Sequence, residues 1–345
     1  MSSVKKTNLN LNLIRIFAAW MVLSVHIANR LDIDFSVGTK GVQLFFMLSG
    51  YLAFCSLANQ SSPGAYYKKR IVRILPTYWL SLMLLYCRDF LFGLLQGFSP
   101  LDLFTGQCSP RFLRYVFGLQ CILPSENWAL WNNRSALWTM SSFFAFYLIA
   151  PLLFKILKKF PIAVLLTLAA MLFREPVTNL IQLLLSPYPP DAHIEWFAGS
   201  NPLTQLHCFL LGITIYLAHK EHKDSQCVFG AILVLIVTQL NWYVYELLFM
   251  LLLFAAVELP PLSRSPALGR LASFLSDGSF ALYLIHPMIF TVLPTAFLQL
   301  ASFPRLAIMI NAAIQYIVCI LVTYTLYYLI ISRLERVVYQ RAYNQ

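Results

Sequence analysis

Charged side chains are scarce in this sequence. They account for 11% of its 345 residues, whereas a soluble globular domain typically carries about 25%. Hydrophobic residues make up 59% of the chain, and the mean hydropathy is +0.69. This composition argues against a soluble enzyme or binding domain and predicts an all-α polytopic membrane protein.

Acidic residues are the scarcer of the two charged classes. The chain has 14 Asp and Glu residues against 25 Lys and Arg residues, which gives a formal net charge of +11. The basic residues occur in short clusters between apolar runs, which is typical of loops retained on the cytoplasmic side of a membrane. Anionic lipid is therefore a simpler partner for these clusters than nucleic acid, and we expect no nucleic acid to bind.

Metal-binding patterns of cysteine and histidine are also missing. The seven cysteines include no Cys-x-x-Cys pair and no Cys/His cluster, so no metal site is predicted. Cys108 and Cys121 both lie in the longest segment between apolar runs, 88–135. An oxidising compartment could join them, but the sequence leaves the formation of this disulfide open.

Apolar runs divide the chain into about ten predicted transmembrane helices. They cover 11–29, 38–58, 74–95, 136–155, 161–185, 202–219, 226–241, 243–258, 278–300 and 304–331. The fifth run is interrupted at Pro176, and proline commonly kinks or breaks a helix. With the N-terminus inside, sixteen Lys and Arg residues fall on the inner side and eight on the outer side. This bias predicts that both termini are cytoplasmic, in one integral-membrane domain, 1–345, with a large external loop at about 88–135.

The first apolar run carries two ionisable side chains, Arg15 and His26. Eleven residues at about 100° per residue make roughly three turns, so both side chains share one helix face, about 16 Å apart. The bilayer penalises such groups unless they face a polar interior. Apolar packing requires neither group, and the pair therefore indicates function.

Four motifs follow one another along the chain. They are Arg15-x10-His26, the segment GVQLFFMLSGY at 41–51, Arg70-x-x-Arg73 with Pro76, Tyr78 and Trp79, and the segment SFALYLIH at 279–286. In this order, and at these positions in the predicted topology, they resemble the motifs of the membrane-bound acyltransferase family 3, whose members O-acylate surface glycans. The motifs span most of the chain.

The resemblance implies a reaction and its location. The reaction is transfer of an acyl group, with acetyl as the default, from cytoplasmic acyl-CoA to a hydroxyl of a cell-surface or lipid-linked glycan such as O-antigen or exopolysaccharide. The implied location is the bacterial inner membrane. Acetyl-CoA would then be a donor substrate, and no permanently bound cofactor is expected.

His26, paired with Arg15, is the predicted catalytic residue. An imidazole titrates near neutrality, so it can act as a general base or accept the acyl group transiently. The alternative is a buried neutral histidine bonded to a backbone carbonyl. The shared helix face with Arg15 and the resemblance both favour the catalytic role.

Arg15, Arg70 and Arg73 are predicted to converge near the cytoplasmic ends of the first and third runs. A guanidinium is a planar fork of donors that suits phosphate oxygens, so these three residues are expected to bind the phosphates of an acyl-CoA. The alternative is simple anchoring by positive charge on the inner side. We favour that alternative for Lys68 and Lys69.

Four further residues are candidate substrate contacts, namely His286, Tyr283, Trp138 and Ser49. Pro287 removes a backbone hydrogen bond next to His286 and can open a polar pocket. Ser49 and Gly50 are expected to permit close approach of two helices. A nucleophilic role for Ser49 is the less favoured interpretation.

One position departs from the pattern of the family. The segment 138–147 reads WTMSSFFAFY, where the family commonly has W-S-L-x-x-E-x-x-F-Y. Phe143 therefore stands where the relatives carry a carboxylate. Glu246, in the eighth apolar run, is a candidate replacement, and an interfacial glutamate without such a role is the alternative.

Two other functions are compatible with a polytopic chain. A glycan transporter or flippase would use the same charges to line a path and would not consume a thioester. Repeat symmetry between the two halves would favour transport, and none is visible. A signalling or scaffold protein gives no account of Arg15 and His26 on one helix.

Overall fold

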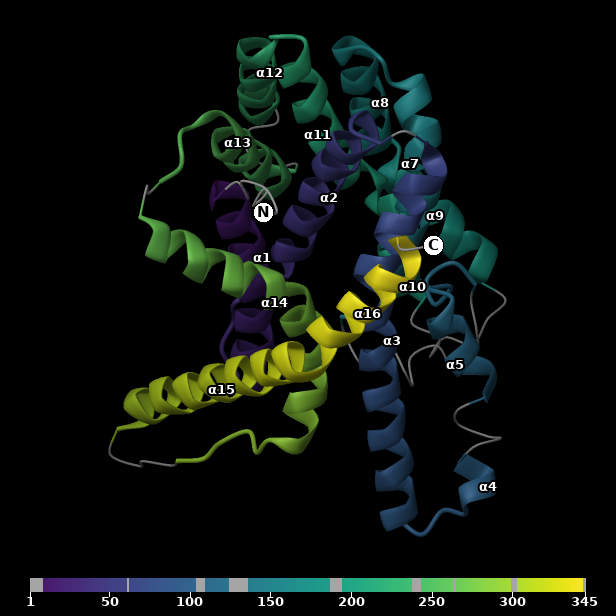
Figure 1. The fold of residues 1–345 in the computed structure, drawn as a ribbon, viewed down its shortest axis with the longest axis vertical. Helices are drawn as coiled ribbons and strands as arrows, with labels where there is room; N and C mark the ends of the chain where they lie inside the picture. Colours follow the sequence, from purple (N-terminus) through teal and green to yellow (C-terminus); the bar gives the residue numbers. More distant parts are fainter. Residues whose placement is uncertain are drawn as a thin grey trace.

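The computed structural model describes residues 9–60, 62–103, 109–123, 136–186, 194–237, 243–262, 265–298 and 303–343. The described residues form helices and connecting segments and contain no strand (Figure 1). This confirms the all-α fold class.

The helices follow the chain in a simple order. Their bounds are α1 Leu9–Arg30, η1 Ser36–Lys40, α2 Gly41–Ala58, α3 Pro63–Leu95, α4 Pro100–Asp102, α5 Ser109–Val116, α7 Thr139–Ile156, α8 Phe160–Leu172, α9 Arg174–Leu185, α10 Ile194–Ser200, α11 Pro202–Lys220, α12 Asp224–Val237, α13 Val244–Glu258, α14 Pro266–Val292, α15 Pro304–Leu326, η4 Tyr327–Ile331 and α16 Ser332–Tyr343. α15, η4 and α16 are continuous, and η4 is a short π-helical segment that joins the other two.

Six helices of the described chain are long and apolar enough to cross a membrane, or seven if a bent pair counts as one span. The six are Leu9–Arg30, Ser36–Ala58, Pro63–Leu95, Thr139–Ile156, Pro266–Val292 and Pro304–Arg341. The bent pair is α8 and α9, which meet at 46°, directly before the Arg174-Glu175-Pro176 sequence that predicted a break.

About ten spans are therefore not confirmed in the part of the chain that the structure describes. Two of the predicted spans, 226–241 and 243–258, correspond to α12 and α13, which have 14 and 15 residues. At 1.5 Å per residue they measure only about 21–23 Å, less than the ~30 Å of a hydrocarbon core. The span predicted at 202–219 corresponds to α11, which is not among the six helices. The sidedness of the termini stays a prediction.

The end of α3 agrees with the predicted run 74–95, so the connecting segment begins after residue 95 and not at about 88. α3 continues as helix to Leu95, and α5 folds back against it. The indole of Trp79 donates to the carbonyl of Val116 at 3.1 Å, and the hydroxyl of Tyr78 donates to the carbonyl of Tyr115. Cys108 lies outside the described residues, so the disulfide with Cys121 is untested.

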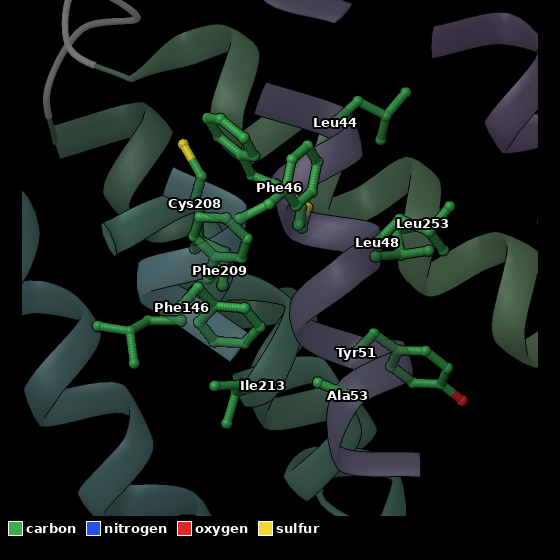
Figure 2. Packing of buried hydrophobic residues seen from close by; sticks show 14 of the residues in the cluster. Leu44, Phe46, Leu48, Tyr51, Ala53, Phe146, Cys208, Phe209, Ile213 and Leu253 are labelled. Atoms are coloured by element: carbon green, nitrogen blue, oxygen red, sulfur yellow. The ribbon is translucent and has the colours of Figure 1, made fainter. Parts of the chain in front are cut away.

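The core is organised around the crossing of α2 and α11. A Cβ atom built on Gly50 would lie 2.1 Å from the carbonyl oxygen of Phe209, and one on Gly212 would lie 1.9 Å from that of Met47. Only glycine allows two backbones to approach this closely. Beside the crossing, Phe209 stacks on Phe146 with ring centroids 4.1 Å apart (Figure 2). The prediction that Gly50 permits close helix approach is confirmed.

A second group of helices completes the fold. α1 packs along α14, and Leu23 and Ile27 are buried with Leu282 and Ile285 in one apolar cluster. α16 packs against α3. α1 therefore contacts both α2 and α14, so side chains of neighbouring helices can reach Arg15 and His26.

Candidate active site

α1 and α14 run in the same direction, and polar side chains of the two helices meet at both ends of their contact. Near the start of α1, Asn12 bonds to Ser276, with 3.2 Å between the two side-chain oxygens. Towards its end, the rings of His26 and His286 lie 5.0 Å apart, centroid to centroid. The contact thus has an ionic end, which contains Arg15, and an imidazole end about 16 Å away along the helix.

The imidazole end contains two histidines of different exposure. His286 is fully buried, and its Nδ1 lies 2.9 Å from the carbonyl oxygen of Leu282. Because a carbonyl can only accept, Nδ1 carries the proton and Nε2 presents a lone pair. This Nε2 is buried and has no hydrogen-bond partner in the protein. His26 is half-buried, so it is the histidine of the pair that remains accessible.

Tyr283 and the start of α7 border the imidazole pair. The hydroxyl of Tyr283 bonds to the hydroxyl of Thr139 at 3.0 Å and to the carbonyl of Ala136 at 3.2 Å. Its ring centroid lies 6.4 Å from that of His286. Trp138 precedes Thr139 and contacts Trp196 at 6.0 Å between ring centroids. The structure thus places His286 against His26 and Tyr283 beside His286. Trp138 is near this group only through its neighbour Thr139, which bonds to Tyr283.

Ser49 has a different position. It is half-buried on α2 next to Gly50, the residue at which α2 crosses α11. This placement favours the packing interpretation of the Ser49-Gly50 pair over a nucleophilic serine.

The ionic end gathers the three predicted arginines. Arg15 interacts electrostatically with Arg70 and Arg73. The guanidinium of Arg70 lies over the rings of Tyr66 and Tyr147, at 5.2 and 4.8 Å from their centroids. Cation–π contacts of this kind hold a guanidinium plane in a fixed orientation.

The guanidinium of Arg70 is only partly satisfied. One of its nitrogens donates to the carbonyl of Leu52 at 3.0 Å, while its buried Nε has no hydrogen-bond partner. An anion that reached this end of the contact would find a donor already oriented and desolvated.

Two carboxylates at the ionic end were missed from the sequence. Asp277 on α14 interacts electrostatically with Arg15 and Arg73. Glu335 on α16 accepts from the hydroxyl of Thr77 at 2.9 Å and also interacts with Arg73. The sequence carried no such signal for Asp277, because it precedes His286 by nine residues, a spacing that places the two side chains on opposite faces of α14.

Phe143 is part of an aromatic core. Its ring lies 5.0 Å from that of Phe46 and 5.9 Å from that of Phe209. Glu246 is buried and accepts a hydrogen bond of 2.8 Å from the side chain of Gln43. Gln43 is two residues before Phe45, which contacts Tyr283. Residues two apart on a helix point in opposite directions, so Glu246 lies on the side of α2 away from Tyr283.

Comparison with known proteins points to one family. A family model described as "Acyltransferase domain" matches residues 8–332. The chain is 25% identical over 307 residues to the acyltransferase MdmB of Streptomyces mycarofaciens, covering 80% of this chain and 77% of the relative. It is 26% identical over 270 residues to a putative acetyltransferase, ORF330, of Acidianus two-tailed virus, covering 73% of each chain.

A further similarity covers less of the chain. Nodulation protein 10 of Rhizobium leguminosarum bv. viciae is 26% identical over 165 residues, which cover 44% of this chain and 45% of the relative. No solved structure matches the chain.

Proposed function

The chain belongs to the acyltransferase 3 family, and from this premise we propose that it is a membrane O-acyltransferase. It moves an acyl group, acetyl in the first instance, from acyl-CoA to a hydroxyl of a cell-surface or lipid-linked glycan. The observation that carries the proposal is the contact between α1 and α14, with three arginines at one end and two histidines at the other.

The arginines suit the phosphate groups of CoA. A guanidinium binds phosphate oxygens through two parallel hydrogen bonds, and the unpartnered Nε of Arg70 is a donor that is already in place. Arg15 and Arg73 add positive charge, which Asp277 balances in part. The phosphates of acyl-CoA therefore bind at the ionic end.

The thioester then reaches the imidazole end. The separation of about 16 Å along α1 is one that the extended pantetheine arm of CoA can bridge. CoA anchored at the arginines thus delivers its acyl carbon close to His26.

At the imidazole end, His26 acts as the general base. It accepts the proton of the glycan hydroxyl while the hydroxyl oxygen attacks the thioester carbonyl. A new C–O bond forms, the C–S bond breaks, and the proton passes from His26 to the departing thiolate. Base catalysis of this kind contributes about 10²–10⁴-fold to a rate.

His286 holds His26 in the orientation that this step needs. Its Nε2 lone pair is unpartnered, and the two rings are 5.0 Å apart. A rotation of the half-exposed His26 ring brings an N–H within hydrogen-bonding distance of this Nε2. The opposite nitrogen of His26 is then the free base for the hydroxyl.

The membrane placement is part of the same proposal. The arginine end faces the cytoplasm, where acyl-CoA is found, and the imidazole end opens towards the outer half of a bacterial inner membrane, where the glycan is found. The excess of Lys and Arg on the inner side supports this orientation, with both termini in the cytoplasm.

The test is release of free thiol from acetyl-CoA by the purified protein in nanodiscs, with and without a candidate polysaccharide. An acyltransferase releases thiol in proportion to acylated glycan. A transporter or flippase with the same charges binds glycan and leaves the thioester intact, and that result would refute the proposal.

A further inference from the structure

A group of three metal-binding side chains lies outside the α1–α14 contact. His219 is in the last turn of α11, Asp224 begins α12 and Glu258 ends α13. The ligand atoms of the three side chains all lie within 4.8 Å of one another. His219 and Asp224 are close in sequence, whereas Glu258 is 39 positions from His219 and is brought to them by the packing of α13 beside α11 and α12 (Figure 1).

The contacts within this group are close. Nδ1 of His219 contacts Oε1 of Glu258, and it lies 3.9 Å from Oδ1 of Asp224. That Oδ1 is buried and has no hydrogen-bond partner. A buried carboxylate oxygen without a partner lacks the compensation that desolvation requires, so this atom is the part of the group that an ion would satisfy.

We propose that His219, Asp224 and Glu258 bind a divalent transition metal ion, with Zn²⁺ as the first candidate. Imidazole nitrogen and carboxylate oxygen are ligands that Zn²⁺ takes at about 2.0–2.2 Å. One nitrogen and two carboxylate oxygens supply three positions, and water completes the site. The set is unsuited to Ca²⁺, which takes six to eight oxygen ligands.

The geometry needs only small adjustments to close around the ion. Ligands about 2.1 Å from a tetrahedral metal are about 3.4 Å from one another. His219 and Glu258 must separate slightly, and Asp224 must approach His219. The side chains of His219, Asp224 and Glu258 are 51%, 28% and 30% exposed. These adjustments therefore move side chains at helix ends and leave the core unchanged.

The site would connect three helix ends to the start of α1. The residues directly after Glu258 are held by Asn10, whose side-chain amide donates to the carbonyls of Leu259 and Pro260 at 3.1 and 3.3 Å. Asn10 precedes Arg15 by five residues. A metal on Glu258 would therefore stabilise the segment that fixes the arginine end of α1.

The experiment measures binding of Zn²⁺ itself and does not depend on acyl transfer. Chelator-treated protein in nanodiscs is titrated with Zn²⁺ by calorimetry, and metal retained after dialysis is quantified by mass spectrometry. We expect one Zn²⁺ per chain. Co²⁺ in place of Zn²⁺ should give the visible absorption of a four-coordinate site.

Variants locate the site. His219→Ala and Glu258→Gln should each weaken Zn²⁺ binding by at least about tenfold, because each removes a ligand. His222→Ala is the matched control, since this histidine lies three residues away and outside the group. Glu258→Gln keeps the size of the side chain and serves if His219→Ala does not fold.

Two results would overturn the proposal. Wild-type protein that retains no Zn²⁺ and gives no heat on titration would leave the three residues as a group of mutual polar contacts without a metal. Equal Zn²⁺ binding by wild type and both ligand variants would place the metal elsewhere. Either result leaves the proposed acyl transfer untouched, because that rests on the α1–α14 contact.

Discussion

Replacement of Gly212 by alanine tests the crossing on which the core is built. The added Cβ would lie 1.9 Å from the carbonyl oxygen of Met47 and 2.8 Å from the backbone nitrogen of Tyr51. These neighbours are backbone atoms, which cannot rotate away. α2 and α11 must therefore separate by more than an ångström to reach ordinary van der Waals distance.

The expected magnitude follows from two opposing effects. Overpacking of a well-packed core destabilises by about 1–3 kcal/mol, and loss of the aromatic contacts beside the crossing adds to this. In the opposite direction, alanine in place of glycine within a helix stabilises the folded state by up to about 1 kcal/mol through its higher helix propensity. The net effect of Gly212→Ala is a loss of about 1–3 kcal/mol in the free energy of unfolding.

Thermal unfolding in detergent, followed by size-exclusion chromatography, measures this effect. The matched control is Gly230→Ala in α12, where an added Cβ meets nothing within 4 Å. The control should retain or raise the unfolding temperature, because only the gain in helix propensity remains. An unfolding temperature for Gly212→Ala equal to that of the control would refute the close crossing.

Two further predictions concern the site. Arg70→Lys keeps the charge but loses the planar fork of donors and the stacking on Tyr147. The Kd for acyl-CoA, measured by calorimetry, should therefore rise about tenfold. The control is Lys155→Ala, which removes an exposed cation of α7 and should leave this Kd unchanged. An equal effect of both substitutions would support simple anchoring. His286→Leu removes the Nε2 lone pair and leaves no acceptor in its place, so kcat for thiol release should fall at least about tenfold while KM for acyl-CoA stays constant. The control is His207→Leu, because His207 is also a buried histidine whose Nδ1 bonds to a backbone carbonyl. Equal rates of thiol release by the two variants would contradict a positioning role for His286.

Some of the site could be predicted because it is local in sequence. Arg15 and His26 lie on one helix, so the helical repeat alone places them on one face. The Ser49-Gly50 pair was likewise indicated as a point of close helix approach, because both residues are small and lie within an apolar run; its partner Gly212 was not. The arginines of α3 could be assigned to the same end as Arg15 from the order of the spans.

The partners of these residues could not be predicted in the same way. His286 faces His26 across 260 residues, and Asp277 reaches Arg15 from the same distant helix. Only the parallel packing of α1 and α14 creates both contacts. Periodicity describes one helix at a time and says nothing of which helix lies beside it.

Fewer spanning helices are identified among the described residues than hydropathy alone predicts. Hydropathy registers α12 and α13 as apolar runs, but their length depends on where each helix begins and ends. The described part of α12 ends at Val237 and that of α13 begins at Val244, and over these bounds neither helix covers ~30 Å of hydrocarbon. Burial within the helix bundle explains the apolar character of α11, since 13 of its 19 residues are buried.

The most direct test of acyl transfer is thiol release from acetyl-CoA by wild type and by His26→Ala, each purified in nanodiscs with a candidate glycan. We predict that the wild type releases thiol in step with glycan acylation. The variant should retain its binding of acetyl-CoA and lose thiol release by at least about 10²-fold, because the general base is gone. Release at the wild-type rate by His26→Ala, with the same acylated product, would contradict the account.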